Sequence, residues 1–586
     1  MASYRFFPFR VVVLLLGHLS AGFFLALGFA SCSEEKSALT EISNVDRIKE
    51  MIATEELVQQ LTPNLRALGA AMVNGTRAGL PAAIAEGPSK PPWQDLDPNH
   101  RWTSASFGTL AASFEGTGFL MKTKFEGVRR GQDGSIVGIS AKQKLHWQKD
   151  GDIEGGWKLV KWEPLDFHTD QSPRPLFEEV LDQVITDPSA LKTARTSFQE
   201  EVLRKTFAGE TAEVGRFKVT SSPDVESGQQ YPAVSVMDFD SDGHEDFFLS
   251  ARWVRPQLFR NRGDGTYEEV AEARGLEVDS HVTCAVFADF DNDGDPDALL
   301  GRSFERALYY RNEGGHFIDV TDIDSDLGQL LVVSSMAVSD VNGDGLLDVY
   351  LSTYNTPIGH IKDLKPGILS PRQTERFIHY LKTDSLPFLN ERGFPNVLLM
   401  NRGNGCLERA GGEVVELYRK SYQPLWFDAD GDGDDDLYVC NDFGPDTYLR
   451  NDTPKGAKAP VLVEAFDEVF PDMKMAYGMG ASLGDYDNDG DLDLFISNMY
   501  SKAGNRIVPT FENTDPRIIV AARGNFLYQN QGGVFRLANE ADAPETKVGW
   551  AFGGQFADFN NDGWLDLYIP SGFYTAPREV ATEVDL

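Results

Sequence analysis

Cysteine and histidine are both scarce in this 586-residue chain, with four and nine copies respectively. Apart from Cys32 near the N-terminus, the cysteines are Cys284, Cys406 and Cys440, which cannot all pair with one another. No spacing of these residues is typical of a disulfide framework or a zinc site. The sequence therefore excludes both, and we expect the three cysteines to be small buried apolar side chains.

Basic residues are few relative to acidic ones. The chain has 54 Lys and Arg against 90 Asp and Glu, and its net charge is −36. A phosphate backbone is bound through Lys and Arg, so this balance argues against nucleic acid as a partner. With 41% hydrophobic residues the chain is not a disordered acidic tail. Much of the acidity lies in short clusters, which favours metal binding over general solubility.

The motifs of common hydrolases are missing as well. The sequence contains no nucleophile elbow, no HExxH and no Cys/His pair. Five of the histidines, at 244, 281, 316, 360 and 379, show no common spacing. We therefore expect no enzymatic activity. The alternative is an extracellular enzyme such as a polysaccharide lyase or a hydrolase, because a Lys or Arg residue on the propeller face remains a candidate base.

The N-terminus does contain a leader-like segment. Arg5 and Arg10 precede the apolar run VVVLLLGHLSAGFFLALGFA, and SCSEEK follows. Residues 29–32 resemble a bacterial lipobox, so we expect residues 1–31 to be a lipoprotein-type signal peptide and Cys32 to carry the lipid. About 20 apolar residues can also span a bilayer, so an uncleaved anchor stays open, as does ordinary secretion. Each alternative places the remaining chain outside the cytoplasm.

After a short linker, residues 32–39, the patterning predicts a small α+β domain over 40–207 whose role is unknown. Apolar residues between 48 and 68 recur at helical spacing. Residues 81–98 are rich in Pro, Gly and Ala and indicate a loop. Residues 102–167 alternate like strands, with a turn at Asp150 and Gly151. Residues 175–207 are amphipathic and predict further helix.

The chain from 213 to 586 is repetitive. Acidic clusters begin at residues 238, 289, 340, 428, 485 and 558, at intervals of 51, 51, 88, 57 and 73 residues. About 50 residues is the size of one four-stranded propeller blade. The longest interval predicts an insertion at about 355–395, which is a candidate contact region. Six clusters are compatible with a propeller of either six or seven blades. Residues 215–222 are a candidate for closing the ring by pairing with the last blade.

A second repeated pattern lies between the clusters. Segments 257–270, 307–320, 397–409 and 526–537 each run from apolar residues through an Asn/Gly turn to apolar residues again. This pattern predicts a hairpin. One repeat is then a strand, an acidic loop, a second strand and a hairpin, which together make a blade.

The six acidic segments share a nine-residue pattern. Asp stands at positions 1, 5 and 9, Asp or Asn at position 3, and Gly at position 6. We number these loops 1 to 6 along the chain. Positions 1, 3, 5, 7 and 9 are Asp238, Asp240, Asp242, His244 and Asp246 in loop 1; Asp289, Asp291, Asp293, Asp295 and Asp297 in loop 2; Asp340, Asn342, Asp344, Leu346 and Asp348 in loop 3; Asp428, Asp430, Asp432, Asp434 and Asp436 in loop 4; Asp485, Asp487, Asp489, Asp491 and Asp493 in loop 5; and Asp558, Asn560, Asp562, Trp564 and Asp566 in loop 6.

Calcium accounts for this pattern better than other metals do. It accepts six to eight oxygen ligands in a flexible shell, whereas magnesium requires a stricter octahedron. The glycine permits a sharp turn with positive φ. Position 7 varies in residue type, so we expect it to supply a backbone carbonyl. An EF-hand is excluded because position 12 is Leu, Val or Ile and apolar strand-like runs follow. We therefore expect up to about six Ca²⁺ ions.

These repeats resemble the FG-GAP/VCBS repeats, the calcium-binding blades also seen in integrin α-subunit propellers. The segments YGMGASLGDYDNDGDLDLFISN at 477–498 and NRGDGTYEEVAEARGL at 261–276 are similar to the cartilage-acidic-protein (ASPIC/UnbV) group. The resemblance covers about residues 213–586. It implies a β-propeller with calcium in the loops between strands, usually on a secreted or surface protein. Propellers of this family commonly have seven blades, whereas the sequence has six loops.

Taken together, the sequence predicts a mainly β protein, with a small α+β domain followed by a calcium-binding β-propeller. The expected function is binding of an extracellular protein or glycan at the cell surface, with the chain held at the membrane by its N-terminal lipid or signal anchor. Calcium would be structural in this arrangement.

Overall fold

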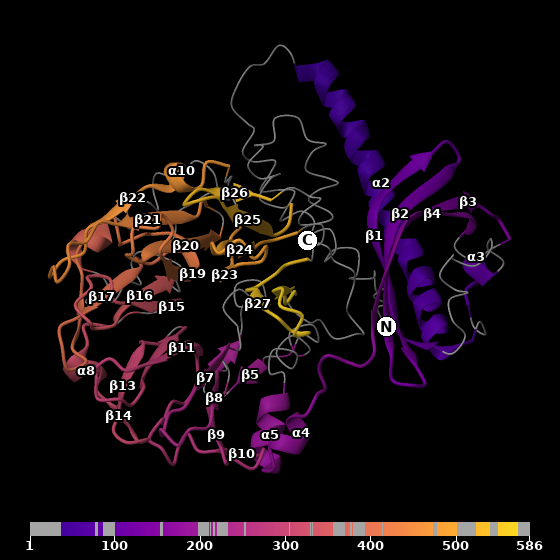
Figure 1. The fold of residues 1–586 in the computed structure, drawn as a ribbon. Coiled ribbons are helices and arrows are strands. Elements are labelled where there is room, and N and C mark those ends of the chain that lie inside the picture. Colours follow the sequence, from indigo (N-terminus) through magenta and orange to yellow (C-terminus); the bar gives the residue numbers. More distant parts are fainter. Residues whose placement is uncertain are drawn as a thin grey trace, which may run out of the picture.

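A computed structural model of the chain defines the fold (Figure 1). The structure describes residues 37–76, 80–85, 100–196, 212–219, 233–354, 393–500 and 523–571 apart from short gaps inside these ranges, and a few isolated positions elsewhere. The predicted signal peptide, Cys32 and most of the 355–395 insertion lie outside the described residues. Among the helices that are described, none is long and apolar enough to cross a membrane.

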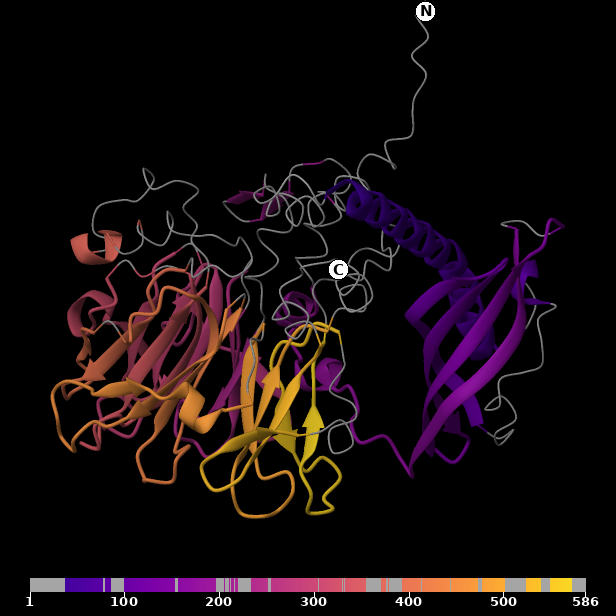
Figure 2. The ribbon, with the colours of Figure 1, turned by 90° about the horizontal axis from the view of Figure 1, so that it is seen from above.

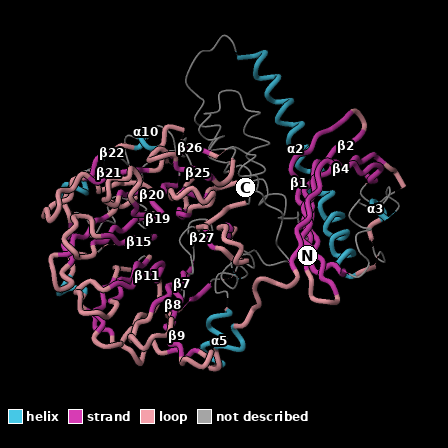
Figure 3. Tube along the Cα trace, viewed as in Figure 1, coloured by secondary structure: helices cyan, strands magenta, loops and turns pink. Residues whose placement is uncertain are grey.

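The N-terminal part is a four-stranded antiparallel sheet with one long helix against it (Figure 3). The helix is α2 (Ser37–Asn74), followed by the short α3 (Ala82–Ala85). The strands β1 (His100–Glu115), β2 (Gly118–Gly131), β3 (Ile136–Lys149) and β4 (Trp157–Ser172) pair in chain order. The β3–β4 turn contains Asp150 and Gly151, as predicted.

The core of this sheet–helix unit follows from the two periodicities of its sequence. In β2 and β3 alternate side chains are buried, among them Phe125, Leu145 and Trp147. In α2, Leu57, Leu61, Leu65 and Leu68 are buried in the same hydrophobic cluster. A strand turns every second residue to one face, and a helix presents every third or fourth, so each element supplies one apolar face.

Five four-stranded antiparallel sheets follow, arranged around a common axis as the blades of a propeller (Figures 1 and 2). Their strands are β7 (Ala233–Met237), β8 (Asp246–Ser250), β9 (Gln257–Asn261) and β10 (Tyr267–Glu269) in blade 1; β11 (Val282–Ala288), β12 (Asp297–Arg302), β13 (Leu308–Asn312) and β14 (Phe317–Asp319) in blade 2; β15 (Val333–Ser339), β16 (Asp348–Thr353), β17 (Val397–Asn401) and β18 (Leu407–Arg409) in blade 3; β19 (Lys420–Phe427), β20 (Asp436–Asp442), β21 (Thr447–Asn451) and β22 (Leu462–Glu464) in blade 4; and β23 (Gly480–Gly484), β24 (Asp493–Ser497), β25 (Phe526–Asn530) and β26 (Phe535–Leu537) in blade 5. A sixth, two-stranded sheet consists of β27 (Gln555–Ala557) and β28 (Asp566–Tyr568).

The first strand of each blade lies nearest the axis. Consecutive first strands contact one another, from β7 to β11, β15, β19, β23 and β27. Hydrophobic clusters then fill the space between neighbouring blades; one of them joins Phe248 of blade 1 to Phe317 of blade 2. The blades are therefore held mainly by face-to-face packing, and among the described residues no strand of one four-stranded sheet pairs with a strand of another.

The predicted repeat is confirmed. All four segments expected to be hairpins form the third and fourth strands of a blade, and all six acidic loops join a first strand to a second. The structure adds a fifth hairpin, β21–β22, in which Thr453 rather than a glycine stands two residues after the asparagine, Asn451. The 355–395 insertion separates the second and third strands of blade 3.

The expectation that residues 215–222 close the ring was wrong for the part that is described. β6 (Phe217–Val219) pairs with β5 (Ala212–Val214) in a separate two-stranded sheet. The three residues of β6 follow β5 after two residues, and such a short connection favours a local hairpin over distant pairing.

Two short helices instead lie at the seam between the first and last blades. They are α4 (Leu181–Val184) and α5 (Pro188–Arg195), and they pack on the face of blade 1 that turns away from blade 2. Ile185 forms a parallel bridge with Tyr267, and Gln257 donates a hydrogen bond to the carbonyl of Ala190. Phe177, just before α4, makes an edge contact with Phe559 of the sixth sheet. Asp187 caps α5 and separates it from α4, where a single helical stretch was expected.

The cysteine expectation holds in part. Cys440 is buried, whereas Cys284 and Cys406 are half-buried, and all three are free thiols. Burial raises the pKa of the Cys284 thiol to about 12, which keeps it protonated at neutral pH.

Candidate metal centres between the blades

The six acidic loops lie side by side along the ring. In three pairs, the side chain at position 4 donates a hydrogen bond to the loop of the next blade. Ser241 reaches Asp295, Asn292 reaches the carbonyl of Gly345, and Asn488 reaches the carbonyl of Gly563. The carboxylates of neighbouring blades are therefore gathered on one end of the propeller.

Position 1 fixes the shape of each loop. One oxygen of its carboxylate accepts the N–H of position 5, and the other accepts the N–H of the glycine at position 6. In loop 1 these are the N–H groups of Asp242 and Gly243, at 3.1 and 2.8 Å from Asp238. The same two bonds occur in all six loops, at 2.7–3.1 Å. An acidic residue is thus needed here even before any ligand is considered.

The expected glycine conformation is confirmed in every copy. Position 6 has φ between 85° and 100° in all six loops. Position 4 is also left-handed; Asn292, Asn488 and Asn561 stand there in three loops, with φ of 60°, 57° and 59°. Gly and Asn tolerate this conformation best, which explains the residue types at both positions except Ser241 of loop 1, with φ of 55°.

Position 5 supports the turn, because its Oδ1 accepts the N–H of position 7 in all six loops at 2.9–3.0 Å. The residue at position 7 is thus fixed through its backbone, which fits its variable side chain. Its proposed role as a carbonyl ligand stays a prediction.

Position 9 is the most buried acidic residue in loops 1 to 5. Asp246, Asp297, Asp436 and Asp493 are 0% exposed and Asp348 is 1% exposed. One oxygen accepts the N–H of position 2 in all six loops at 3.1–3.2 Å. Burial, the largest cause, raises the carboxyl pKa to about 6 in Asp246, Asp436 and Asp493, and to about 7 in Asp297 and Asp348. Asp566 of the two-stranded sixth sheet is only half-buried.

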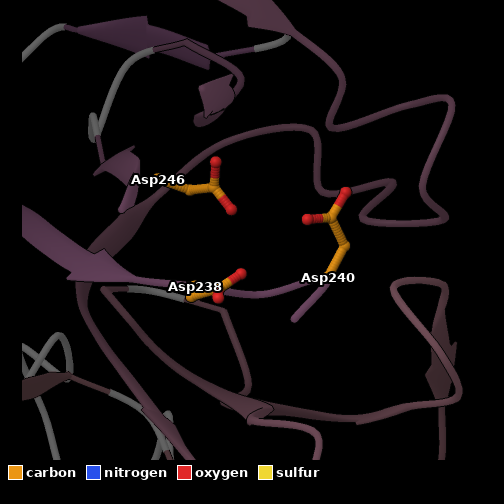
Figure 4. Close-up of side chains that lie close together, drawn as sticks. All are labelled: Asp238, Asp240 and Asp246. Carbon is orange, nitrogen blue, oxygen red and sulfur yellow. The ribbon is translucent and has the colours of Figure 1, made fainter. Parts of the chain in front are cut away.

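Position 3 points its carboxylate toward positions 1 and 9, as Figure 4 shows for loop 1. Loops 1, 2, 4 and 5 each bring one oxygen from three aspartates to within 4.8 Å of one another. The groups are Asp238, Asp240 and Asp246; Asp289, Asp291 and Asp293; Asp428, Asp430 and Asp436; and Asp485, Asp487 and Asp493. Within the described residues, loops 3 and 6, which carry Asn at position 3, form no such group.

One oxygen at position 3 has no hydrogen-bond partner in three loops. The Oδ1 atoms of Asp240, Asp291 and Asp487 are buried without any partner among the described residues. The side chain of Asp240 is 8% exposed and that of Asp291 is 12% exposed. A buried carboxylate oxygen without a partner is costly, so these three atoms indicate a place for a positive ligand.

An asparagine that the sequence patterns did not single out completes each of the five full blades. It ends the third strand, at Asn261, Asn312, Asn401, Asn451 or Asn530, and its N–H donates to the second oxygen of position 9 at 2.6–2.8 Å. It recurs just before the turn of every predicted hairpin, so an alignment of those hairpins would have found it.

The same asparagine joins neighbouring blades. The Nδ2 of Asn312 donates to the carbonyl of Phe239 in loop 1 at 2.8 Å. Asn401 and Asn451 make the equivalent bonds to Phe290 and Val341, at 2.7 and 2.9 Å. Position 9 of one loop is therefore connected, through one side chain, to position 2 of the preceding loop.

The hairpin turn of each later blade also covers the preceding loop. A Cβ on Gly315 would come 2.8 Å from the Cβ of Asp240, and one on Gly405 would come 3.3 Å from that of Asp291. In blade 4, the N–H of Gly456 donates to the carbonyl of Asn342 at 2.6 Å. Loops 1 to 4 thus lie at seams, with their acidic residues on one blade and their cover on the next.

We predict that Asn312→Ala destabilises the propeller by about 2–4 kcal/mol, because it removes two buried hydrogen bonds and one partly buried one, with two carbonyls losing this donor. Urea unfolding followed by tryptophan fluorescence measures this. Glu313→Ala, at the exposed next residue, is the matched control and should stay within about 0.5 kcal/mol of the parent. Equal midpoints for the two variants would contradict the role of Asn312.

We also predict that the chelator-treated protein loses stability as pH rises from 5.5 to 8. The position 9 carboxyls have a higher pKa folded than unfolded, so the folded state binds more protons and deprotonation destabilises it. Urea midpoints at the two pH values test this. Asp348→Asn, which removes one titrating group, should reduce the difference, and a midpoint that increases with pH would contradict the prediction.

Comparison with known protein families identifies three matching segments. Residues 238–300, 289–351 and 428–496 match the model described as FG-GAP-like repeat. Each match starts at position 1 of an acidic loop, and together they include loops 1 to 5. No curated protein matches the sequence.

Two solved structures contain chains similar to this one. The first is the crystal structure of BBS1N in complex with ARL6DN, soaked with lead, and the second is a mutant of the Synechocystis apocarotenoid oxygenase. The first has a TM-score of 0.27 and 8% identity, and the match covers 58% of this chain and 76% of the other. The second has a TM-score of 0.32 and 9% identity, with coverage of 76% and 80%. Likenesses at this level support no conclusion about function. The repeat matches lie on blades built as four-stranded sheets, so residues 238–351 and 428–496 contain FG-GAP-like repeats.

Proposed function

We propose that the acidic loops bind calcium ions and that these ions hold the blades of the propeller together. The observation that carries the proposal is the buried, unpartnered Oδ1 at position 3 of loops 1, 2 and 5, which lies among converging carboxylates. Hydrogen bonds from the protein satisfy much of positions 1 and 9 but leave this atom free.

The donor set fits calcium. Each loop offers oxygen atoms alone, from positions 1, 3, 5 and 9, with a backbone carbonyl at position 7 as a further candidate. Calcium accepts six to eight oxygens at variable geometry, and magnesium holds fewer in a stricter octahedron. Loops 3 and 6 carry an amide at position 3 in Asn342 and Asn560, so each offers one carboxylate fewer. When bound, the ion would supply charge compensation for the clustered aspartates.

The chain's own residues explain how such an ion would add stability. Without it, three or four carboxylates repel one another in a partly buried site. The Asn of the next blade and its hairpin turn already contact loops 1, 2 and 3, so a rigid loop there also fixes its neighbour. Any ion that binds only the folded state stabilises it by mass action.

The wider role proposed for the protein is that of an extracytoplasmic binding module without enzymatic activity. The leader-like residues 1–31 and the lipobox-like Cys32 support export and lipid anchoring of the N-terminus. Millimolar calcium outside the cytoplasm suits loops of moderate affinity. An extracellular protein or glycan is the proposed ligand, since a propeller offers a broad face of loops. The similarity of 261–276 and 477–498 to the ASPIC/UnbV group belongs to this same proposal.

Thermal unfolding of the chain from residue 33 tests the calcium proposal. We expect a fall in Tm of more than 10 °C on removal of calcium by a chelator, full recovery with calcium and little recovery with magnesium, because only calcium fits an irregular oxygen cage. Asp240→Asn with Asp487→Asn should reduce the calcium-dependent part of Tm, and Asp264→Asn, an exposed hairpin residue outside the loops, should not. A melting curve that does not change with calcium would contradict the proposal.

A further inference from the structure

The residue just before the recurring asparagine contacts position 3 of its own blade's loop in blades 1, 2 and 5, and its type differs between blades. It is Arg260 in blade 1, Arg311 in blade 2, Met400 in blade 3, Arg450 in blade 4 and Gln529 in blade 5. A structurally equivalent position is thus cationic beside some acidic loops and neutral beside others.

In loop 1 the arginine occupies the outer side of the carboxylate cluster. Its Nε lies 2.5 Å from Oδ2 of Asp240, and its Nη2 lies 2.6 Å from Oδ2 of Asp242. Arg274 adds a second guanidinium, 3.3 Å from the same oxygen of Asp240. Two positive charges therefore stand beside the four carboxylates of loop 1, and Oδ2 of Asp242 is held by Arg260 rather than left for another ligand.

In loop 5 an uncharged side chain makes the equivalent contact. Nε2 of Gln529 donates to Oδ2 of Asp487 at 2.5 Å. The loop has the same four carboxylates at positions 1, 3, 5 and 9, and Asp491 at position 7 adds a fifth. The unpartnered Oδ1 is present at position 3 in both loops, so at positions 1, 3, 5 and 9 the two centres have the same acidic residues and differ in the charge beside them.

We propose that the residue before the recurring asparagine sets the calcium affinity of each loop, so that loop 5 binds the ion more tightly than loop 1. This inference rests on the proposed function. Arg260 acts as a positioning residue: it orients Asp240 and Asp242 through hydrogen bonds, but its charge repels the ion and competes with it for those carboxylates.

The magnitude follows from Coulomb's law. A unit charge about 6 Å from a divalent ion, at an effective dielectric near 20, changes affinity by several powers of ten before solvent screening, and at least about tenfold remains after it. A glutamine keeps the hydrogen bond without this repulsion.

The other loops agree with a graded series. Arg311 lies 3.2 Å from Asp291 but also donates to Asp324, so its charge is shared with a carboxylate outside loop 2. Arg450 is turned toward Asp452, with contacts of 2.8 and 3.1 Å, and is likewise neutralised away from loop 4. Loop 1 is therefore the centre with the greatest uncompensated positive charge beside it among these four.

Hydrogen exchange of the chain from residue 33, followed by mass spectrometry at increasing free calcium, tests the series loop by loop. Peptides that contain residues 238–246 and 485–493 report loops 1 and 5 through the amides of positions 5 to 7. We expect half-maximal protection of loop 5 at a free calcium concentration at least tenfold below that of loop 1. Arg260→Gln should lower the loop 1 midpoint at least tenfold, and Gln529→Arg should raise the loop 5 midpoint by a similar factor.

Two controls separate charge from folding. Arg260→Lys keeps the charge, so the loop 1 midpoint should stay within about threefold of that of the parent. Arg262 pairs with Glu268 outside the loops, so Arg262→Gln should change neither midpoint. Equal midpoints in the parent, or no shift in both Arg260→Gln and Gln529→Arg, would overturn the inference while calcium binding itself stood. Protection that does not depend on calcium in any loop would overturn the proposed function and this inference together.

Discussion

The buried carboxylate at position 9 is the interaction on which each blade depends. Its two oxygens accept one N–H from the start of its own loop and one from the asparagine at the end of the third strand, so it ties the loop to the body of the sheet. That asparagine in turn donates to the loop of the preceding blade. A single acidic residue thereby links two strands of one blade and, through one side chain, the neighbouring blade. Burial raises the pKa of this carboxyl, so its ionised form depends on the hydrogen bonds it accepts and on any positive charge nearby.

This constraint explains why the acidic residues are clustered. Position 1 holds the turn by accepting two N–H groups, and position 5 extends it, so two of the aspartates have a structural role without any ion. Position 3 has no comparable role in loops 1, 2 and 5, because one of its oxygens is buried without a partner. A bound calcium ion, as proposed, would complete the bonding of this atom. In loops 1 and 2 the hairpin turn of the next blade covers this residue, so the same ion would also stiffen the seam between those blades.

Much of the propeller could be predicted from the sequence, because a nine-residue loop pattern and an apolar–turn–apolar hairpin recur at blade-length intervals. The positive φ of the glycine at position 6 followed from its residue type. Contacts between blades could not be predicted in this way: the bond from Asn401 to Phe290 spans 111 residues, and no local pattern indicates the partner. The packing of α4 and α5 on blade 1 could not be predicted either. The amphipathic pattern of residues 181–195 indicates helices, but it would be the same if those helices belonged to a separate domain. The turn of the fifth hairpin, at 452–461, escaped notice because Thr453 stands where the other hairpins have a glycine.

Anomalous X-ray diffraction from crystals of the chain grown in millimolar calcium, with data collected at a wavelength where calcium scatters anomalously, would test the central claim most directly. The account predicts a peak in loops 1, 2 and 5, bonded to the Oδ1 atoms of Asp240, Asp291 and Asp487 at about 2.3–2.6 Å with six to eight oxygen ligands. Density that shows only water at these atoms, or a guanidinium turned into the centre, would contradict it.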